Sequence, residues 1–307
     1  MPFTPDQMID RKRLKAQLGR WRFIAILAGF VALFAFLSPD KMGVTASQSY
    51  IARITIDGVM TDDEKRDALI EKIKNDTHAK AVIVRFDTPG GTALAGEEVY
   101  LQLRALAEKK PVVAVMRTVC ASAGYMAALG ADHIIAREST ITGSIGVMVQ
   151  SVEISRLADK LGITPITIKS GEFKDSPSLT KPFSERERAI VSETVEDAYA
   201  FFVKLVAERR NLNIVTAERL ADGRVYTGRQ AHALTLIDGL GADAEAIAWM
   251  TKNHHIPSTL KVIDHEPEVE FTSILDKLQQ LTNIKIFSSL IVPLDGLVSL
   301  WHPSTQF

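Results

Sequence analysis

Cysteine is nearly absent from this chain of 307 residues, because Cys120 is its single occurrence. One cysteine forms no intramolecular disulfide and provides no cysteine-based zinc site. The seven histidines are scattered, and none lies in the HExxH pattern of zinc peptidases. We therefore expect no bound metal ion.

An excess of charge of either sign is also missing. The 36 lysines and arginines nearly balance the 37 aspartates and glutamates, which leaves a formal net charge of −1. A chain with this balance has no overall electrostatic attraction to nucleic acid. We expect no nucleic-acid partner, and the length fits one large α/β domain or two modest ones.

Long apolar runs are rare, and the clearest is residues 23–37 (FIAILAGFVALFAFL). Basic residues dominate the segment before it, which predicts a membrane anchor at 23–38 with residues 1–22 in the cytoplasm and the bulk of the chain on the far side. Residues 39–49 would be a linker. A cleaved signal peptide with a site near 44–46 is the main alternative, and a buried core helix is another.

Strand and helix patterns alternate between residues 50 and 250. Apolar runs predict strands, a capping box at Thr61 and Glu64 predicts a helix to Asn75, and a second one at Ser184 and Glu187 opens a long helix to Arg210. The predicted strands are 50–56, 81–86, 112–116, 133–136 and 164–168. This order predicts an α/β domain over 50–265 with a mostly parallel sheet. Residues 266–307 would be an extension for packing or subunit contact.

Two turns at strand ends carry the candidate chemistry. Ser122 follows the strand at 112–116 and begins a small-residue helix over 121–129, and the turn 87–91 (DTPGG) follows the strand at 81–86. Ligands of parallel sheets bind at these ends, so the N–H groups of Gly91 and Ala123 would form a two-donor oxyanion hole. The alternatives are that Ser122 is an ordinary N-cap and that the two turns are unrelated.

A nucleophilic serine needs a base, and no motif places a histidine for that role. Lys174 lies in the polar loop 169–182, and a lysine acts as a base only where desolvation or nearby positive charge lowers its pKa. By composition alone Lys174 is a solvated lysine. Cys120 is interpreted as a small buried apolar side chain rather than a nucleophile.

Five segments make the chain similar to the short bacterial form of the signal peptide peptidase A family, which belongs to peptidase family S49 and has a fold like that of Clp protease and the crotonases. They are 87–91, 121–125, 142–147, 169–175 and 225–231. The resemblance implies Ser122 as nucleophile, Lys174 as base, Gly91 as oxyanion donor and Ser144 as the hydroxyl that orients the lysine. Gly90 and Tyr125 are candidates for the substrate groove. Ala123 departs from the glycine that is usual after the serine.

The resemblance further implies a serine endopeptidase of the bacterial inner membrane that needs no cofactor and cleaves remnant signal peptides and other peptides. Its catalytic domain would be extracytoplasmic, in a ring-like homo-oligomer such as an octamer, with serine and lysine supplied by neighbouring subunits. Three alternatives remain open at this point: a SohB-type peptidase, a crotonase-like acyl-CoA hydratase or lyase, and an inactive membrane scaffold.

Overall fold

The computed structural model describes residues 18–29, 48–267 and 298–300. The chain divides into two units, Met1–Gln48 and Ser49–Phe307. In the first unit, residues 18–29 form a helix with exposed side chains. The rest of the predicted anchor, from residue 30 on, lies outside the described residues. In the part of the chain that the structure describes, no helix combines the length and apolar character of a membrane span.

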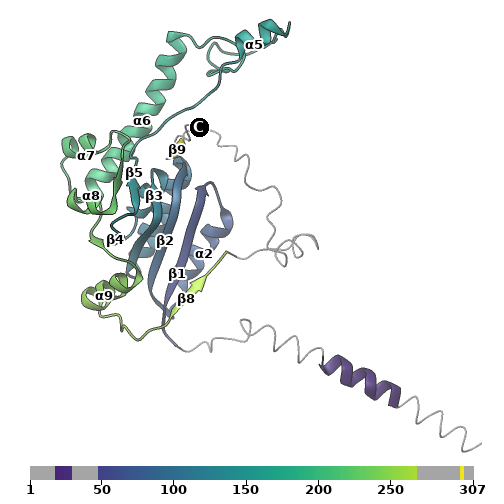
Figure 1. Cartoon of the computed structure of the whole chain (residues 1–307), viewed down its shortest axis with the longest axis vertical. Helices are drawn as coiled ribbons and strands as arrows, with labels where there is room; N and C mark the ends of the chain where they lie inside the picture. Colours follow the sequence, from purple (N-terminus) through teal and green to yellow (C-terminus); the bar gives the residue numbers. More distant parts are fainter. Residues whose placement is uncertain (1–17, 30–47, 268–297, 301–307) are drawn as a thin grey trace, which may run out of the picture. The chain divides into compact units, whose positions relative to one another are not determined.

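The second unit is built on one sheet whose strands lie mostly parallel (Figure 1). Along the sheet the order is β6-β5-β3-β2-β1-β8, with β4 beside β3, β7 beside β4 and β9 beside β2. Two pairs, β5 with β6 and β2 with β9, are antiparallel. The strands are β1 (Tyr50–Met60), β2 (Ala79–Thr92), β3 (Val112–Ala121), β4 (His133–Ala136), β5 (Ile141–Gly143), β6 (Val225–Thr227), β7 (Gly239–Leu240), β8 (Val262–His265) and β9 (Val298–Leu300).

Helices cover both faces of this sheet. Alternate strand residues point to opposite faces, so Val82, Val84 and Phe86 join one core cluster while Ala81 and Ile83 join the other. The first cluster packs against α2, α3, α4 and the C-terminal half of α6, and the second against α9. The helices are α2 (Glu64–Asn75), α3 (Ala93–Ala107), α4 (Ala123–Ala128), α5 (Ser155–Lys160), α6 (Glu185–Arg209), α7 (Ile214–Leu220), α8 (Gly228–Ala233) and α9 (Asp243–His254).

The predicted mixed α/β fold with a mostly parallel sheet is confirmed, and several predicted details need correction. The cap of α2 is Asp63, whose carboxylate accepts hydrogen bonds from two backbone N–H groups of the first turn, and not Thr61. The strand predicted at 164–168 does not form. Its side chains at Ile166 and Ile168 are 88% and 97% exposed, and no described strand lies beside it to pair with its backbone.

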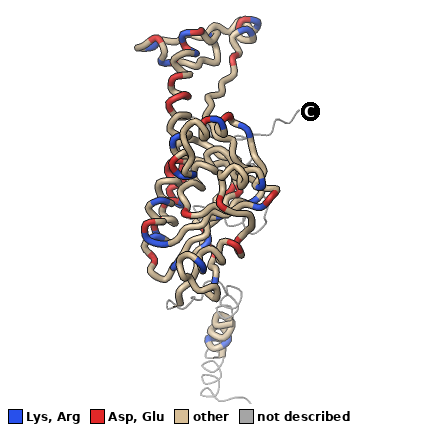
Figure 2. Tube along the Cα trace, turned by 90° about the vertical axis from the view of Figure 1, so that its left-hand side faces the viewer, with Lys and Arg blue, Asp and Glu red and all other residues tan. Residues whose placement is uncertain are grey.

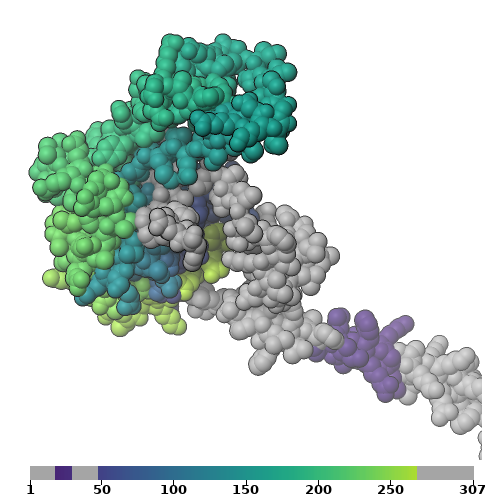
Figure 3. All heavy atoms as spheres, turned by 45° about the horizontal axis from the view of Figure 1, so that its top comes forward, coloured from purple at the N-terminus to yellow at the C-terminus, as the bar shows by residue number. Residues whose placement is uncertain are grey.

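Residues 147–201 form an arm that stands out from the sheet (Figures 1 and 3). The arm contains α5, the N-terminal half of α6 and the loop between them, which Figure 3 shows in teal at the top. It exposes many large apolar side chains, namely Val152, Ile154, Leu157, Leu161, Ile163, Ile166, Ile168 and Leu179. Charges of both signs are interspersed over the arm and the sheet domain (Figure 2). The apolar surface of the arm therefore lacks a partner within the described part of its own chain.

Candidate active site

Ser122 lies at the junction of β3 and α4. Its backbone has a φ of 57° and a ψ of −122°, its N–H donates a 2.8 Å hydrogen bond to the carbonyl oxygen of Gly143, and the residue is 1% exposed. A non-glycine residue rarely adopts positive φ unless its surroundings hold it there. The Ser122 side chain makes no capping hydrogen bond to α4, so the ordinary N-cap role does not explain this serine.

Gly90 and Gly91 lie just before Thr92, the last residue of the neighbouring strand β2, so the segment 87–91 that was predicted as a turn is part of that strand. The φ of Gly90 is 111°, and a Cβ placed on Gly91 would lie 1.8 Å from the carbonyl oxygen of Met60 on β1. Both positions therefore require glycine. Strand pairing aligns Thr88 of β2 with Cys120 of β3. Gly90 and Ser122 each come two residues after this pair, so the glycine segment and the serine turn lie side by side at the ends of adjacent strands. The predicted juxtaposition of the two turns is present.

Ser144 enters the same region from the other side of β3. Gly143 pairs with Ala121, so Ser144 and Ser122 each come directly after a paired residue. Ser144 has a φ of 49°, is 9% exposed, and donates its N–H to the carbonyl oxygen of Arg224 at 2.8 Å. The pairing of β5 with β3 thus brings both candidate hydroxyl groups to one end of the sheet.

Lys174 lies elsewhere in the chain, on the loop between α5 and α6. Figure 1 shows this loop in the arm, away from the sheet. The residue is exposed, and its backbone N–H donates to the carbonyl oxygen of Gly171 at 3.3 Å. Within one subunit the structure therefore brings Ser122, Gly91 and Ser144 together and leaves Lys174 apart from them.

Two further residues of the α4 region belong to the core. Tyr125, predicted to line the substrate groove, is fully buried and donates its hydroxyl to the carbonyl oxygen of Leu236 at 2.7 Å, so that prediction is wrong. Cys120 is also fully buried, and burial together with the nearby Asp87 raises the pKa of its thiol. A buried thiol of this kind is a poor nucleophile, as the sequence predicted.

Asp87 has a structural role that the sequence did not reveal. Its carboxylate accepts hydrogen bonds from the backbone N–H of Val119 at 3.2 Å and from the hydroxyl of Thr118 at 3.3 Å. These bonds join β2 to β3 where the strand register shifts, just before both turns. The only sequence feature that could have indicated this role is the position of Asp87 at the start of the DTPGG segment.

The strand β9 also adjoins the site. Its backbone pairs antiparallel with residues 90–92, opposite Leu300, Ser299 and Val298. A peptide that bound this edge of β2 as an added strand would have to replace β9.

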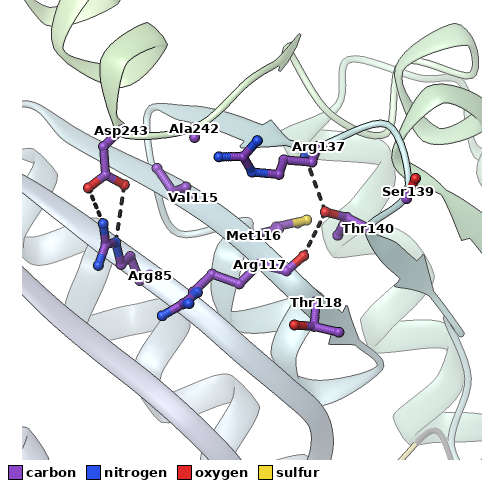
Figure 4. A pocket seen from close by; sticks show the side chains of 10 residues that line it. All are labelled: Arg85, Val115, Met116, Arg117, Thr118, Arg137, Ser139, Thr140, Ala242 and Asp243. Atoms are coloured by element: carbon purple, nitrogen blue, oxygen red, sulfur yellow. Dashed lines mark hydrogen bonds and ion pairs between the residues drawn. The ribbon is translucent and has the colours of Figure 1, made fainter.

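A cavity of about 380 Å³ lies apart from these residues, on the face of the sheet that carries α9 (Figure 4). Arg85 forms an ion pair there with Asp243. Asp243 forms a second ion pair with Arg53, in which Oδ2 lies 2.8 Å from Nη1. Arg117 and Arg137 make no side-chain ion pair with the described residues. None of Ser122, Gly91, Ser144 and Lys174 lines this cavity.

A group of three carboxylates is the one place among the described residues where ligands for a metal come close. Oxygen atoms of Asp62, Asp67 and Glu98 lie within 4.8 Å of one another. Asp62 of this group is exposed, and Asp67 and Glu98 are partly exposed. Such acidic groups are common on surfaces, so it does not by itself define a metal site.

The sequence of the chain is similar to those of known peptidases. The sequence pattern of peptidase family S49 matches residues 104–256. A Synechocystis sp. protein named as a protease is 38% identical over 207 residues, which cover 67% of this chain and 74% of that protein. An Enterococcus faecium protein named as a signal peptide peptidase, SppA, is 33% identical over 230 residues, with 70% and 67% covered.

Two matches are more partial. The chloroplastic serine protease SPPA of Arabidopsis thaliana is 36% identical over 214 residues, but this chain covers only 32% of it. The solved structure of a membrane-bound stomatin-specific protease is 18% identical with a TM-score of 0.47, over 72% of this chain and all of that one, a likeness too low for an inference. On the sequence matches, the chain belongs to peptidase family S49 and is a serine peptidase.

Proposed function

We propose that this peptidase is a membrane-anchored endopeptidase with a Ser122–Lys174 dyad, and that it cleaves remnant signal peptides and other peptides. The observation that carries the proposal is the backbone of Ser122, held at positive φ beside the glycine turn at Gly91. Strained backbone at a buried serine whose side chain does not cap the following helix is typical of a nucleophile.

In the proposed reaction, Ser122 Oγ attacks the scissile carbonyl carbon while Lys174 Nζ accepts the hydroxyl proton. The N–H groups of Gly91 and Ala123 stabilise the oxyanion of the tetrahedral intermediate. Lys174 then protonates the leaving amine, and later it takes a proton from the water that hydrolyses the acyl-enzyme. Ser144 orients the lysine amine. Ala123 follows Ser122 as the first residue of α4 and does not have a positive φ, so alanine is compatible with the donor role there.

We infer that serine and lysine meet across a subunit boundary in a ring-like homo-oligomer. Two observations support this inference: the loop that carries Lys174 belongs to the arm, and the arm exposes many large apolar side chains. A neighbouring copy that covered the arm would bury this surface and remove water from the lysine amine. Desolvation lowers the pKa of a lysine towards the value that a general base needs.

Membrane anchoring is proposed from the sequence, with the basic residues before the apolar run 23–37 as its support. The anchor would place the N-terminus in the cytoplasm and the peptidase domain outside the inner membrane. The name of the Enterococcus faecium relative supports signal peptides as one substrate class.

The test is turnover of a fluorogenic peptide by the full chain in detergent, together with labelling by a fluorophosphonate. The wild type should turn over the peptide and be labelled at Ser122, whereas Ser122→Ala, Lys174→Ala and Lys174→Arg should each lose turnover while keeping the fold. Arginine fails because its guanidinium keeps its proton. Ser144→Ala should be milder. Activity of Lys174→Arg close to wild type would exclude lysine as the base, and an unlabelled but folded wild type would favour a crotonase-like enzyme or an inactive scaffold.

A further inference from the structure

The residues immediately before Lys174 are held by the first turn of α6. Arg186 donates from Nη1 to both carboxylate oxygens of Glu172 at 3.1 Å, and its guanidinium lies 5.1 Å from the ring centre of Phe173. One arginine thus fixes two consecutive residues of the loop.

The residue immediately after Lys174 is held by two lysines. The Asp175 carboxylate lies 2.6 Å from Lys169 Nζ and 3.1 Å from Lys181 Nζ. The hydrogen bond from Lys169, and then the one from Lys181, hold the pKa of Asp175 below its usual value. Asp175 is therefore ionised at neutral pH and bridges the two ends of the loop.

Lys181 links this bridge to Glu187 in the first turn of α6. Glu187 is 6% exposed, and its Oε1 accepts from Lys181 Nζ at 2.7 Å and from Ser176 Oγ at 2.7 Å. Its Oε2 accepts from the N–H and the hydroxyl of Ser184 at 2.9 and 2.7 Å, which completes the capping box of α6. Lys181, followed by Ser176 and Ser184, holds the pKa of Glu187 far below its usual value.

Lys174 contrasts with all of its neighbours. Its side chain makes no ion pair or hydrogen bond within the described residues, and it is exposed. Every adjacent residue from 172 to 176 other than Lys174 has a side-chain contact that fixes it. The loop is thus ordered around a single free lysine, which is a costly arrangement unless that lysine is to be presented to another group.

We propose that Asp175, Lys181 and Glu187, here called the loop anchor, position Lys174 for catalysis in a neighbouring subunit. The inference rests on the proposed function, in which Lys174 is the general base. Glu187 is a positioning residue, because it acts on Lys174 through Lys181, Asp175 and Ser176 and touches no reacting atom. The loop anchor ties the backbone after Lys174 to the first turn of α6, and Arg186 of the same turn holds the two residues before it.

The first test is Glu187→Gln in the full chain, assembled in detergent and assayed with a fluorogenic peptide. Glutamine keeps the size of the side chain and an acceptor for Ser184 but loses the negative charge that pairs with Lys181. We expect kcat to fall about 10- to 100-fold, the effect of misplacing a catalytic group by roughly 1 Å, with little change in KM. The rising limb of the pH–kcat profile should move to higher pH, because a loosely held Lys174 is better hydrated.

The matched control is Glu185→Gln, which makes the same chemical change two residues earlier. The Glu185 side chain is 92% exposed and only approaches Arg188 at 3.7 Å. This variant should keep the wild-type kcat and pH profile. An equal loss of kcat in both variants would overturn the proposal, and so would an unchanged kcat and pH profile in a folded Glu187→Gln.

A second pair of variants decides the matter if Glu187→Gln does not fold. Lys181 is partly exposed, and Lys181→Gln removes its ion pairs with both Glu187 and Asp175. The hydroxyls of Ser176 and Ser184 still donate to the Glu187 carboxylate in this variant. Lys181→Gln should reproduce the loss of kcat, and Lys181→Arg should restore most of it because arginine keeps the charge. Equal defects in both would overturn the proposal. Lys174→Ala separates the two hypotheses: if it stays active, the dyad is wrong, and if it is inactive while the anchor variants are normal, only the loop anchor is wrong.

Discussion

At the scale of single residues, Gly91 is subject to a severe steric limit, since a Cβ there would overlap the carbonyl oxygen of Met60. Gly91→Ala must displace the end of β2 from β1, at a cost of about 1–3 kcal/mol or more in the free energy of unfolding. The displacement also moves the proposed oxyanion donor, so kcat should fall by about 10²- to 10³-fold. Peptide turnover and urea unfolding measure both effects.

Gly239→Ala is the matched control for this variant. A Cβ on Gly239 would have ordinary contacts at 3.7 Å with His133 and 4.0 Å with Ile135. We expect nearly unchanged stability and turnover. If Gly91→Ala behaved like Gly239→Ala, the tight approach of β2 to β1 would not constrain the site.

The first turn of α2 provides a prediction at the scale of one element. Asp63 accepts from the N–H groups of Lys65 and Arg66 at 3.0 and 3.1 Å, so Asp63→Ala should lower the free energy of unfolding by about 1 kcal/mol. Thr61→Ala should have almost no effect, although the sequence pattern predicted Thr61 as the cap. Urea unfolding of the two variants distinguishes the two assignments, and a larger loss in Thr61→Ala would contradict the observed cap.

Other elements show how far local pattern predicts structure. The capping box at Ser184 and the strand at 133–136 were predicted with their observed bounds, because a cap and a short apolar strand depend on adjacent residues. The strands β1, β2 and β3 extend beyond the predicted 56, 86 and 116, since their ends are stabilised by partner strands far away in the sequence. Sequence periodicity does not contain that information.

At the scale of the whole molecule, stability should fall in mild acid. Burial is the main cause that lowers the pKa of both His133 and His265. The ring of His133 also stacks on Trp249. Below the ordinary histidine pKa of about 6.5, the unfolded chain binds protons that the folded chain does not. The free energy of unfolding should therefore decrease as pH falls from 7.5 to 5.5.

The variant His133→Phe tests this prediction. Phenylalanine can keep the ring stacking on Trp249 but cannot titrate, so the pH dependence of stability should become shallower. Urea unfolding at several pH values measures the slope. An unchanged slope would show that His133 does not contribute to the loss.

The shared active site leads to a prediction about the assembled molecule. Ser122→Ala and Lys174→Ala should each be inactive alone, whereas a mixture assembled from both should recover part of the turnover, because an intact serine of one subunit can meet an intact lysine of another. Native gels with two tags confirm that the subunits mixed. Mixed oligomers without any turnover would place both residues of the dyad in one chain.

The sequence by itself determined the alternation of strands and helices, the serine at a strand-to-helix junction, the glycine pair near the end of a strand, and the family to which the chain belongs. These features follow from local periodicity, from glycine and from motifs whose residues are adjacent. Only the tertiary structure showed that Ser144 lies beside Ser122 and that β9 pairs with residues 90–92. It also showed that Tyr125 is buried in the core and that the Lys174 loop belongs to an arm. Each of these depends on contacts between residues distant in the chain, and backbone pairing and burial are settled only when those residues meet.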